Sequence, residues 1–354
     1  MRRYLAPTIV VAVLGLVFGV FYRYFHDPVI ERDFGNYLRS SLHASGLTLS
    51  GWAVHLYFTS RSSVWVRRWP LAIELMIRSL ATALVVATVA AALEVILYGQ
   101  RNGHLVGRSW LMHDYPLIVA LVFAGSMLFG AVYELVRLVG GRTLVNVMLG
   151  RYRRPTREER VLLFLDLVGS TALAEKMGEL RVQDLLTRFF YDIDEAITAH
   201  GGEVHAYVGD EVIVTWPVTA KPQRAYIECF FAIQDRVASL AGRYSREFGV
   251  VPEFRAGIHA GPVVISECGD SRRQVAYFGD TVNVAARLQA HCKEAGRPLL
   301  VSGALVRLLP ADNDLAIDAL GPIQLRGRAA PIEIFAVARS RVTRSDDSQR
   351  KNAL

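Results

Sequence analysis

The pattern of hydrophobic residues changes near residue 140. Before that point the chain holds long apolar stretches with few charges, at 5–22, 71–97 and 117–136. Stretches of about 18 residues or more are long enough for a helix to cross the hydrocarbon core of a bilayer. After residue 140, short apolar runs alternate with amphipathic stretches and turn-forming residues, which is typical of a soluble domain. The sequence therefore predicts a membrane region followed by a soluble domain.

Two segments of the membrane region allow two interpretations each. The charged start followed by 5–22 also fits a secretory signal peptide. However, no small-residue cleavage site follows and aromatic residues crowd the end of the run, which favours a retained span. The segment 42–58 mixes His, Ser and Thr with apolar residues. It is either a span whose polar groups pack against neighbouring helices or an amphipathic helix on the membrane surface.

The arginine residues favour about four transmembrane helices in residues 1–140. With four, both termini and the loop at 61–68 face the cytoplasm, so most arginines lie on that side, as the positive-inside rule requires. With three, a cytoplasmic soluble domain would place Arg2 and Arg3 outside. We therefore expect a multi-pass protein of the plasma (inner) membrane, in contact with the lipid bilayer, whose soluble domain is cytoplasmic.

Beyond the last apolar stretch, the sequence predicts a linker and one domain. A helical pattern over 144–149 is broken by a glycine and a proline. We expect a helical linker at 141–159, a soluble domain at 160–340 and a disordered polar tail at 341–354. The order of elements is typical of an α+β fold with a mostly antiparallel sheet. The expected strands are 161–166, a hairpin at 203–216, 253–260, 262–268, 273–278, 299–301 and a terminal pair near 315–337. The expected helices are 170–200, 221–248 and 282–295.

Composition indicates which kinds of partner and bound group to expect. Hydrophobic residues make up 52% of the 354 residues, and the formal net charge is +7. Basic residues cluster at the ends of the apolar stretches and at 151–160, which suits anionic lipid headgroups better than nucleic acid, so we expect no nucleic-acid partner. The 3 cysteines have no paired spacing and predict neither a disulfide framework nor a metal site. The histidines before residue 140 show no spacing for haem and are better explained as scattered polar positions.

Candidate chemistry begins at Asp166, which follows the apolar run 161–165. A buried strand of this kind delivers the carboxylate to its tip, and small, turn-forming residues lead from there into a helix. The backbone N–H groups of this loop suit phosphate, and the carboxylate suits a divalent metal ion. The loop residues expected to contact phosphate are Val168, Gly169, Ser170 and Thr171. Taken alone, Asp166 is explained equally well as a cap of the next helix.

A second carboxylate strengthens the prediction of a metal site. Apolar residues flank the Gly209-Asp210 pair on both sides, which predicts a β-hairpin with Asp210 at its turn. Two aspartates on adjacent strand tips can hold two Mg²⁺ ions close together, an arrangement used for in-line displacement at phosphorus.

Four motifs, in this order, resemble those of the class III nucleotidyl cyclases over about residues 159–337. They are FLDLVGST at 164–171, VGDE at 208–211, RAGIHAG at 255–261 and GDTVNVAAR at 279–287. The resemblance implies an α-helical membrane bundle followed by an α+β, ferredoxin-like class III cyclase catalytic domain. It also implies a homodimer, because in this family each site takes its metal-binding aspartates from one subunit and its Asn/Arg pair from the other.

The resemblance implies roles for individual residues. Asp166 and Asp210, with the carbonyl of Leu167, correspond to the ligands of two Mg²⁺ or Mn²⁺ ions. Asn283 and Arg287, one helical turn apart, correspond to the residues that orient the ribose and steady the transition state. Further residues expected to contact the nucleotide are Gly209, Arg255 and Arg326. A salt bridge is an equal alternative for Arg255, and Arg328 competes with Arg326 for the terminal phosphates.

The sequence departs from the family at the two positions that read adenine. Counting back three residues from Gly209 and from Gly279 gives Ala206 and Ala276, where the family has a lysine and an aspartate or threonine. Alanine cannot hydrogen-bond to a base edge, so the choice between ATP and GTP stays open.

The function expected from these features is that of a membrane-anchored adenylate cyclase, which converts ATP to 3′,5′-cyclic AMP and pyrophosphate. A guanylate or relaxed-specificity cyclase is a second interpretation. A nucleotide-binding regulatory domain without catalysis is a third, which the two alanines favour and the intact metal and transition-state residues oppose.

Overall fold

The computed structural model describes residues 2–26, 33–59, 69–102, 108–221, 223–271, 273–310, 315–325 and 330–340. The chain divides into two compact units, Met1–Gly141 and Arg142–Leu354.

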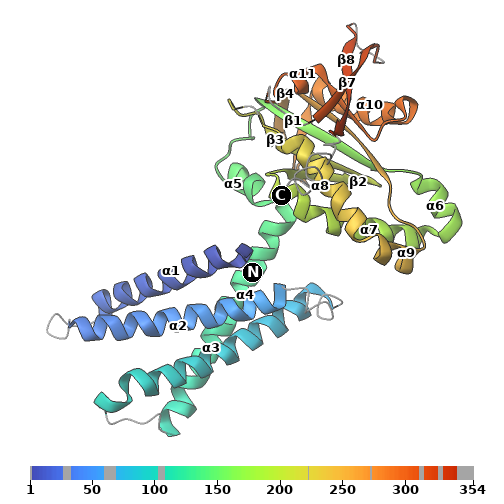
Figure 1. Cartoon of the computed structure of the whole chain (residues 1–354). Helices are drawn as coiled ribbons and strands as arrows, with labels where there is room; N and C mark the ends of the chain where they lie inside the picture. The colour runs from blue at the N-terminus through green and yellow to red at the C-terminus, as the bar shows by residue number, and fades with distance from the viewer. Residues whose placement is uncertain are drawn as a thin grey trace, which may run out of the picture. The chain divides into compact units, whose positions relative to one another are not determined.

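The first unit is helical. Its helices are α1 (Arg2–His26), α2 (Phe34–Thr59), α3 (Leu71–Asn102) and α4 (Arg108–Val139) (Figure 1). Across the described residues, 3 segments are long and apolar enough to cross a membrane: Pro7–Phe25, Leu71–Leu97 and Tyr115–Val136. The segment 42–58 lies within α2, which is not among them because serine, threonine and histidine dilute its apolar residues.

Small and hydroxylated residues join α1 to α2. A Cβ at Gly19 would lie 2.5 Å from the Cα of Ser41, so the two backbones approach closely. Ser40 Oγ donates to the Gly19 carbonyl at 3.0 Å, and Ser45 Oγ donates to the Ala12 carbonyl at 3.2 Å. These serines therefore have hydrogen-bond partners within the helical unit.

A charged pair lies between α3 and α4. Arg78 is 5% exposed, and its Nη1 lies 3.8 Å from Glu134 Oε1. The absence of a side chain at Gly130 makes room for the guanidinium. The two charges compensate each other inside the helical unit, as buried charges in a membrane region must.

The second unit is a mixed sheet with helices on both faces. The strand order is β2–β3–β1–β4–β6–β8–β7, with β5 paired to β4, and β4 and β6 are parallel neighbours. The strands are β1 (Thr156–Leu167), β2 (Glu203–Val208), β3 (Glu211–Pro217), β4 (Phe254–Cys268), β5 (Gln274–Phe278), β6 (Leu299–Ser302), β7 (Leu315–Ile323) and β8 (Ile332–Arg339). The helices are α6 (Ser170–Met177), α7 (Glu179–Ala199), α8 (Ala225–Ser239), α9 (Ala241–Phe248), α10 (Asp280–Ala295) and α11 (Gly303–Val306).

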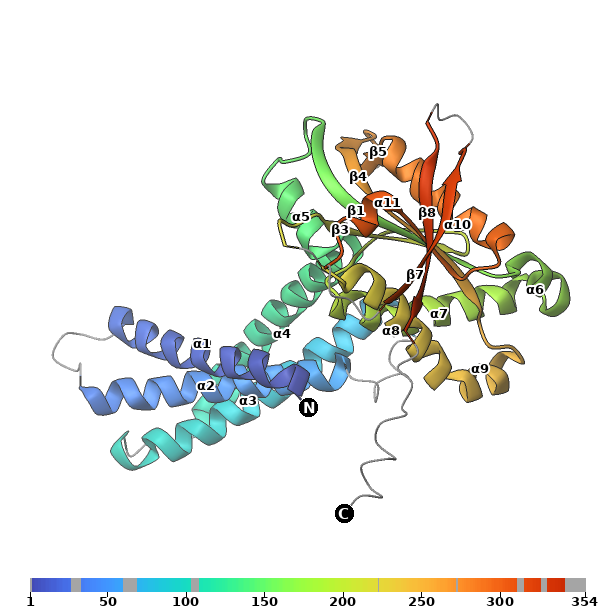
Figure 2. The ribbon, with the colours of Figure 1, turned by 45° about the horizontal axis from the view of Figure 1, so that its top comes forward.

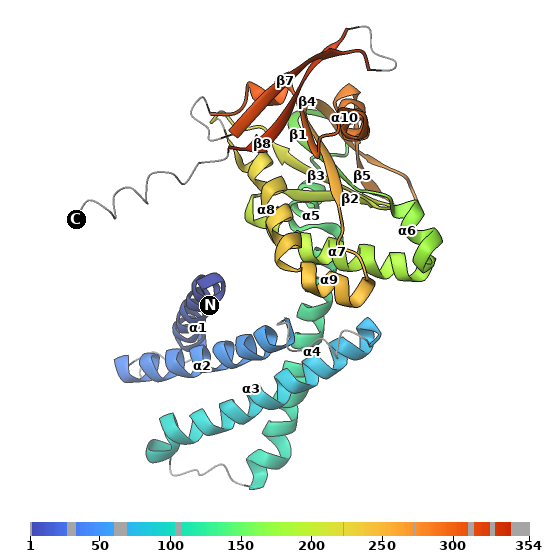
Figure 3. The same ribbon diagram turned by 45° about the vertical axis from the view of Figure 1, so that its right-hand side comes forward.

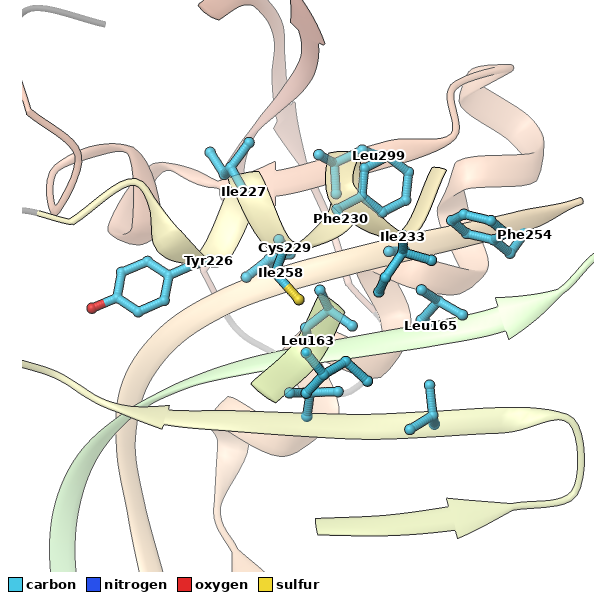
Figure 4. Packing of buried hydrophobic residues seen from close by; sticks show 14 of the residues in the cluster. Leu163, Leu165, Tyr226, Ile227, Cys229, Phe230, Ile233, Phe254, Ile258 and Leu299 are labelled. Atoms are coloured by element: carbon cyan, nitrogen blue, oxygen red, sulfur yellow. The ribbon is translucent and has the colours of Figure 1, made fainter. Parts of the chain in front are cut away.

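The strand β1 is buried on both faces. Val161, Leu163 and Leu165 belong to a core that α7 and α8 complete. Figure 4 shows Leu163 and Leu165 of β1 together with core residues of α8. Leu162 and Phe164 pack on the opposite face, in a cluster that includes a residue of α10. Figures 2 and 3 show α7 and α8 along one face of the sheet and α10 along the other. Burial on both faces explains why this run is continuously apolar instead of alternating.

The strands β1 and β4 are longer than the sequence pattern predicts. Charged residues before the apolar run and the Gly261-Pro262 pair were the expected breaks. Instead, β1 begins at Thr156, β4 runs on through Gly261 and Pro262, and the two pair antiparallel along their length. Pro262 stands opposite Glu159 in this pairing. Contacts between distant segments therefore outweigh the local preference of these residues.

Each of the two long helices expected in this unit is divided. The segment 170–200 forms α6 and α7, which meet at Gly178 with a φ of 87° that only glycine adopts readily. The segment 221–248 forms α8 and α9, which meet at Leu240.

The linker is folded onto the second unit. The helix α5 (Gly141–Met148) is followed by Tyr152, which is 3% exposed and whose carbonyl accepts the Glu267 N–H at 2.9 Å. Asn146 Nδ2 donates to Tyr152 Oη at 3.2 Å. Nearby, Arg160 pairs with Glu158 at 2.7 Å, and both side chains are largely buried. Burial and hydrogen bonding hold this segment against the sheet.

Candidate active site

Asp166 lies near the end of β1 and faces the side of the sheet on which α10 lies. It stands opposite Glu211 of β3 and Arg255 of β4 in the strand register. Directly opposite residues in antiparallel strands point to the same face. The register therefore gathers two carboxylates and one guanidinium at this end of the sheet.

Asp210 lies at the turn between β2 and β3, next to this group. Gly209 precedes it with a φ of 62°, the left-handed conformation that a tight hairpin turn needs. The carboxyl groups of Asp166 and Asp210 lie close enough that the charge of Asp210 raises the pKa of Asp166. The structure thus brings together the two aspartates that the sequence predicts as metal ligands.

Like charges crowd at this point. Burial, followed by the charge of Asp210, raises the pKa of Asp166 to about 6, against the lowering effect of hydrogen bonds from Gln289 and the Leu167 N–H. Burial, followed by the charges of Asp166 and Asp210, raises the pKa of Glu211 to about 7. Carboxylates that repel each other when ionised gain the most from a bound divalent cation.

The aspartate pair fits cations that also bind a triphosphate. In the part of the chain that the structure describes, no three His, Cys, Asp or Glu side chains converge into a metal site of their own. Mg²⁺ commonly takes one or two protein carboxylates and fills its other positions with water and phosphate oxygens. Asp166 and Asp210 are such a pair. Glu211, which the sequence analysis included in the motif at 208–211 without giving it a role, adds negative charge beside them.

The helix α10 carries the Asn283 and Arg287 pair on one face. Asn283 is exposed and Arg287 partly exposed. Their side chains form no hydrogen bond or ion pair with the described part of the chain, so both are available to a ligand. The residue of α10 that reaches the aspartates is Gln289, whose Nε2 donates to Asp166 Oδ2 at 3.1 Å. Sequence reasoning did not identify Gln289, because a side-chain contact over 123 positions leaves no local pattern.

The loop after β1 has the expected turn. Gly169 adopts a φ of 74° and precedes α6, which begins at Ser170. The Val168 N–H donates to the Glu253 carbonyl at 2.8 Å, so it serves the fold. The N–H groups available to phosphate are those of the first turn of α6, which have no partner within the helix.

Of the three arginines considered for contact with phosphate, the structure describes Arg255. Arg255 is partly buried on β4 and forms no ion pair with any described residue, so the salt-bridge alternative gains no support. Arg326 and Arg328 both lie outside the described residues.

Comparison with known proteins identifies the family. Residues 154–338, more than half of the chain, match the family described as "Adenylate and Guanylate cyclase catalytic domain". The chain belongs to this family. The cyclase domain therefore contains all four motifs on which the resemblance rested, and the expected fold class is confirmed.

This chain is similar to known proteins that include two relatives from one organism and one solved structure. It is 36% identical over 222 residues to "Adenylate cyclase 2" of Rhizobium meliloti (strain 1021), covering 62% of this chain and 61% of that protein. It is 30% identical over 191 residues to "Adenylate cyclase 1" of the same organism, covering 52% and 28%. The similar region thus spans less than two thirds of either relative. A bacterial light-regulated adenylyl cyclase shares the fold, with a TM-score of 0.53 at 22% identity over 63% of this chain and 65% of that one.

The positions expected to read the base lie on two neighbouring segments of the cyclase domain. Ala206 is on β2 and Ala276 is on β5. Their chain neighbours His205 and Tyr277 stack with ring centroids 4.1 Å apart, which brings the two strands together. The two alanines therefore belong to one region of the domain, where neither side chain can hydrogen-bond to a base.

Proposed function

We propose that the protein is a membrane-anchored adenylate cyclase that converts ATP to 3′,5′-cyclic AMP and pyrophosphate. The observation that carries the proposal is the Asp166–Asp210 pair, two carboxyl groups that the strand register and the hairpin turn bring to one end of the sheet. A protein has little structural reason to crowd like charges, whereas two divalent ions under a triphosphate require it. The match of the domain to the cyclase family supports the same chemistry.

Each group has a part in the proposed reaction. Mg²⁺ or Mn²⁺, when bound, would lower the pKa of the ribose 3′-hydroxyl and neutralise the triphosphate. Asp166, Asp210 and the carbonyl of Leu167 would hold the ions. The first turn of α6 and Arg255 would bind phosphate oxygens. Asn283 would orient the ribose, and Arg287 would donate to the charge that develops on the transferring phosphorus.

We also propose that two copies of the chain form the working enzyme. Asn283 and Arg287 have no side-chain partner in the described residues of one chain, and the contact of α10 with its own Asp166 is made by Gln289 instead. This arrangement supports a homodimer in which the aspartates of one chain meet Asn283 and Arg287 of the other. Two equivalent sites would be related by a twofold axis.

The helical unit is proposed to anchor the cyclase with four spans and a cytoplasmic catalytic domain. Three helices meet the length and composition of a span. Support for α2 as the fourth comes from its serines, which hydrogen-bond to α1 carbonyls, so polar residues need not exclude α2 from a bilayer. Labelling of single cysteines introduced at residues 30 and 64 tests this arrangement. Four spans place residue 30 outside and residue 64 inside.

Ala206 and Ala276 favour a second candidate, a guanylate or relaxed-specificity cyclase. One experiment tests both. Purified full-length protein in detergent is incubated with ATP or GTP and with Mg²⁺ or Mn²⁺, and the products are identified by mass spectrometry. Cyclic AMP in excess supports the main proposal, and cyclic GMP in excess supports the second. No cyclic nucleotide from either substrate would leave the non-catalytic regulatory domain as the remaining interpretation.

A further inference from the structure

The helix α10 rests directly on β4, and Gly257 allows the contact. A Cβ at position 257 would lie 2.6 Å from the carbonyl oxygen of Ala285 and would also collide with the backbone nitrogen of Gln289. Side-chain carbons do not approach a backbone this closely, so only glycine lets the helix lie at this height above the sheet. Backbone contact therefore fixes where Gln289 stands.

From this position Gln289 reaches Asp166. Its Nε2 donates to Asp166 Oδ2 at 3.1 Å. Gly257 stands opposite Phe164 on β1, which is two residues before Asp166 and on the same face. Asp166 is therefore the next residue of β1 on this face, and the Gln289 side chain extends along the strand to reach its carboxylate.

A neutral amide suits this contact. A carboxylate has about four lone-pair sites. The Gln289 amide donates to Oδ2 of Asp166, and the Leu167 N–H also favours the ionised carboxylate. A lysine or arginine would orient Asp166 equally well, but its positive charge would oppose a divalent cation at the same oxygens. Glutamine orients the carboxylate without that repulsion.

The same helix presents Asn283 and Arg287 from a different face. Positions 283 and 287 are about one turn apart, whereas position 289 is rotated by roughly 200° from 287 at about 100° per residue. Asn283 is exposed, and Gln289 is partly buried against the sheet. One face of α10 therefore contacts Asp166 of its own chain, while another face carries the two residues proposed to serve the partner's site.

We propose that Gln289 is a positioning residue for the cyclase reaction. Its amide holds the Asp166 carboxylate in the orientation that binds the metal ions. Gln289 thereby connects the metal-binding residues of one site to α10, the helix that carries Asn283 and Arg287 for the partner's site. This inference rests on the proposed function, because it assigns Asp166 to the cations.

Mn²⁺ binding to the full-length protein in detergent tests the role of Gln289 separately from turnover. Bound Mn²⁺ is measured by electron paramagnetic resonance in the presence of 3′-deoxy-ATP, which cannot cyclise. The variants are Gln289→Met, which keeps the length and removes the donor, and Gln289→Asn, which keeps the amide but is one methylene too short. Gln183→Met on the exposed face of α7 is the matched control. Thermal unfolding verifies that each variant is folded.

We expect both Gln289 variants to bind Mn²⁺ about 10- to 100-fold more weakly than the wild type, the usual effect of removing a hydrogen bond that orients a metal ligand. Gln183→Met should bind as the wild type does. In an Asp166→Asn background, Gln289→Met should cause less than about a twofold further loss, because the two residues act as a unit.

Wild-type Mn²⁺ affinity in either folded Gln289 variant overturns the proposal. The proposal also fails if Gln289→Met lowers Mn²⁺ affinity by the same factor in the Asp166→Asn background as in the wild type. Should the wild type bind Mn²⁺ yet form no cyclic nucleotide from ATP or GTP, the proposed function fails. The Mn²⁺ comparison would still decide whether Gln289 positions Asp166.

Discussion

Two aspartates of the second unit have opposite surroundings. Asp192 on α7 is 2% exposed and accepts from Arg188 Nε at 2.9 Å and from Tyr244 Oη at 3.1 Å. Asp166 on β1 has a second carboxyl group, that of Asp210, as its neighbour. The first aspartate has the cationic and hydroxyl partners that a folded chain needs. The second forms no ion pair with any described residue, as its proposed role in binding metal ions requires.

The comparison predicts that removal of either aspartate of the pair stops the reaction without harming the fold. In Asp166→Asn or Asp210→Asn, cyclic nucleotide formation should fall about a thousandfold, because the ions lose a carboxylate ligand. The thermal midpoint of metal-free protein should stay the same or rise, because like-charge repulsion is relieved. Asp318→Asn, an exposed aspartate paired with Arg297 at 3.4 Å, is the control and should keep full activity. Turnover in Asp210→Asn at the wild-type rate would refute its role as a metal ligand.

Removal of the charge at Asp192 should have the reverse effect. Asp192→Asn weakens the contacts that join α7 to α8 and α9, and it leaves Arg188 without its carboxylate. Because Arg188 is partly exposed and water replaces part of the loss, we expect the free energy of unfolding to fall by about 2 kcal/mol. Activity per folded molecule should not change. Urea unfolding of the full chain, followed by tryptophan fluorescence, measures the first effect. A large loss of kcat at unchanged stability would show that the contrast between the two aspartates is false.

Base selection offers a smaller effect. Introducing the family's residues as Ala206→Lys with Ala276→Asp should raise the preference for ATP over GTP about tenfold, because a site built to hydrogen-bond a base rejects one that cannot comply. The ratio of kcat/KM for ATP and GTP measures it. Ala206→Met, which adds a similar stem without charge, is the matched control and should not raise the ratio. An unchanged ratio in the double variant would mean that the base is read elsewhere.

The smallest predicted effect is on pH dependence. Because the folded pKa values of Asp166 and Glu211 are raised to about 6 and about 7, both groups hold protons in the folded state that the unfolded state has already lost. In metal-free protein these two groups should therefore contribute fully to the free energy of unfolding below about pH 4. That contribution should be lost as the pH rises through 6 to 7. Mn²⁺ affinity should rise over the same range, because the ion binds the ionised groups.

Glu211→Gln should move the pH range over which Mn²⁺ affinity rises to lower pH, because it removes the group with the higher pKa, about 7, and leaves Asp166 at about 6. Mn²⁺ titrations between pH 5 and 8 measure the shift. If Mn²⁺ affinity rises over the same pH range in Glu211→Gln as in the wild type, Glu211 does not act on the aspartate pair.

The features that the sequence predicts well are those set by neighbours along the chain. The run 161–165 reads as a strand because it is buried on both faces, and the Gly209-Asp210 pair reads as a turn because Gly209 adopts a positive φ. Both aspartates follow from these local patterns. The family resemblance then assigned Asn283 and Arg287, whose spacing a helix places on one face.

The features that sequence reasoning missed depend on pairing between distant segments. Thr156 belongs to β1, and Gly261 and Pro262 do not break β4, because each strand stabilises the other along its length. Glu211 joins the acidic cluster through the register of β1 with β3. Gln289 reaches Asp166 only because α10 lies on Gly257. None of these contacts has a signal within a short window of sequence.

The most direct test of the account is complementation between two inactive chains. Asp166→Asn lacks the metal-binding half of the site, and Arg287→Ala lacks the half proposed to serve the partner. When the two variants are co-expressed and purified together, random pairing should make about half of the dimers heterodimers, each with one intact site. The mixture should therefore have about a quarter of the wild-type cyclase activity. Activity no higher than that of either variant alone, in a mixture shown to contain heterodimers, would contradict a site shared between two chains.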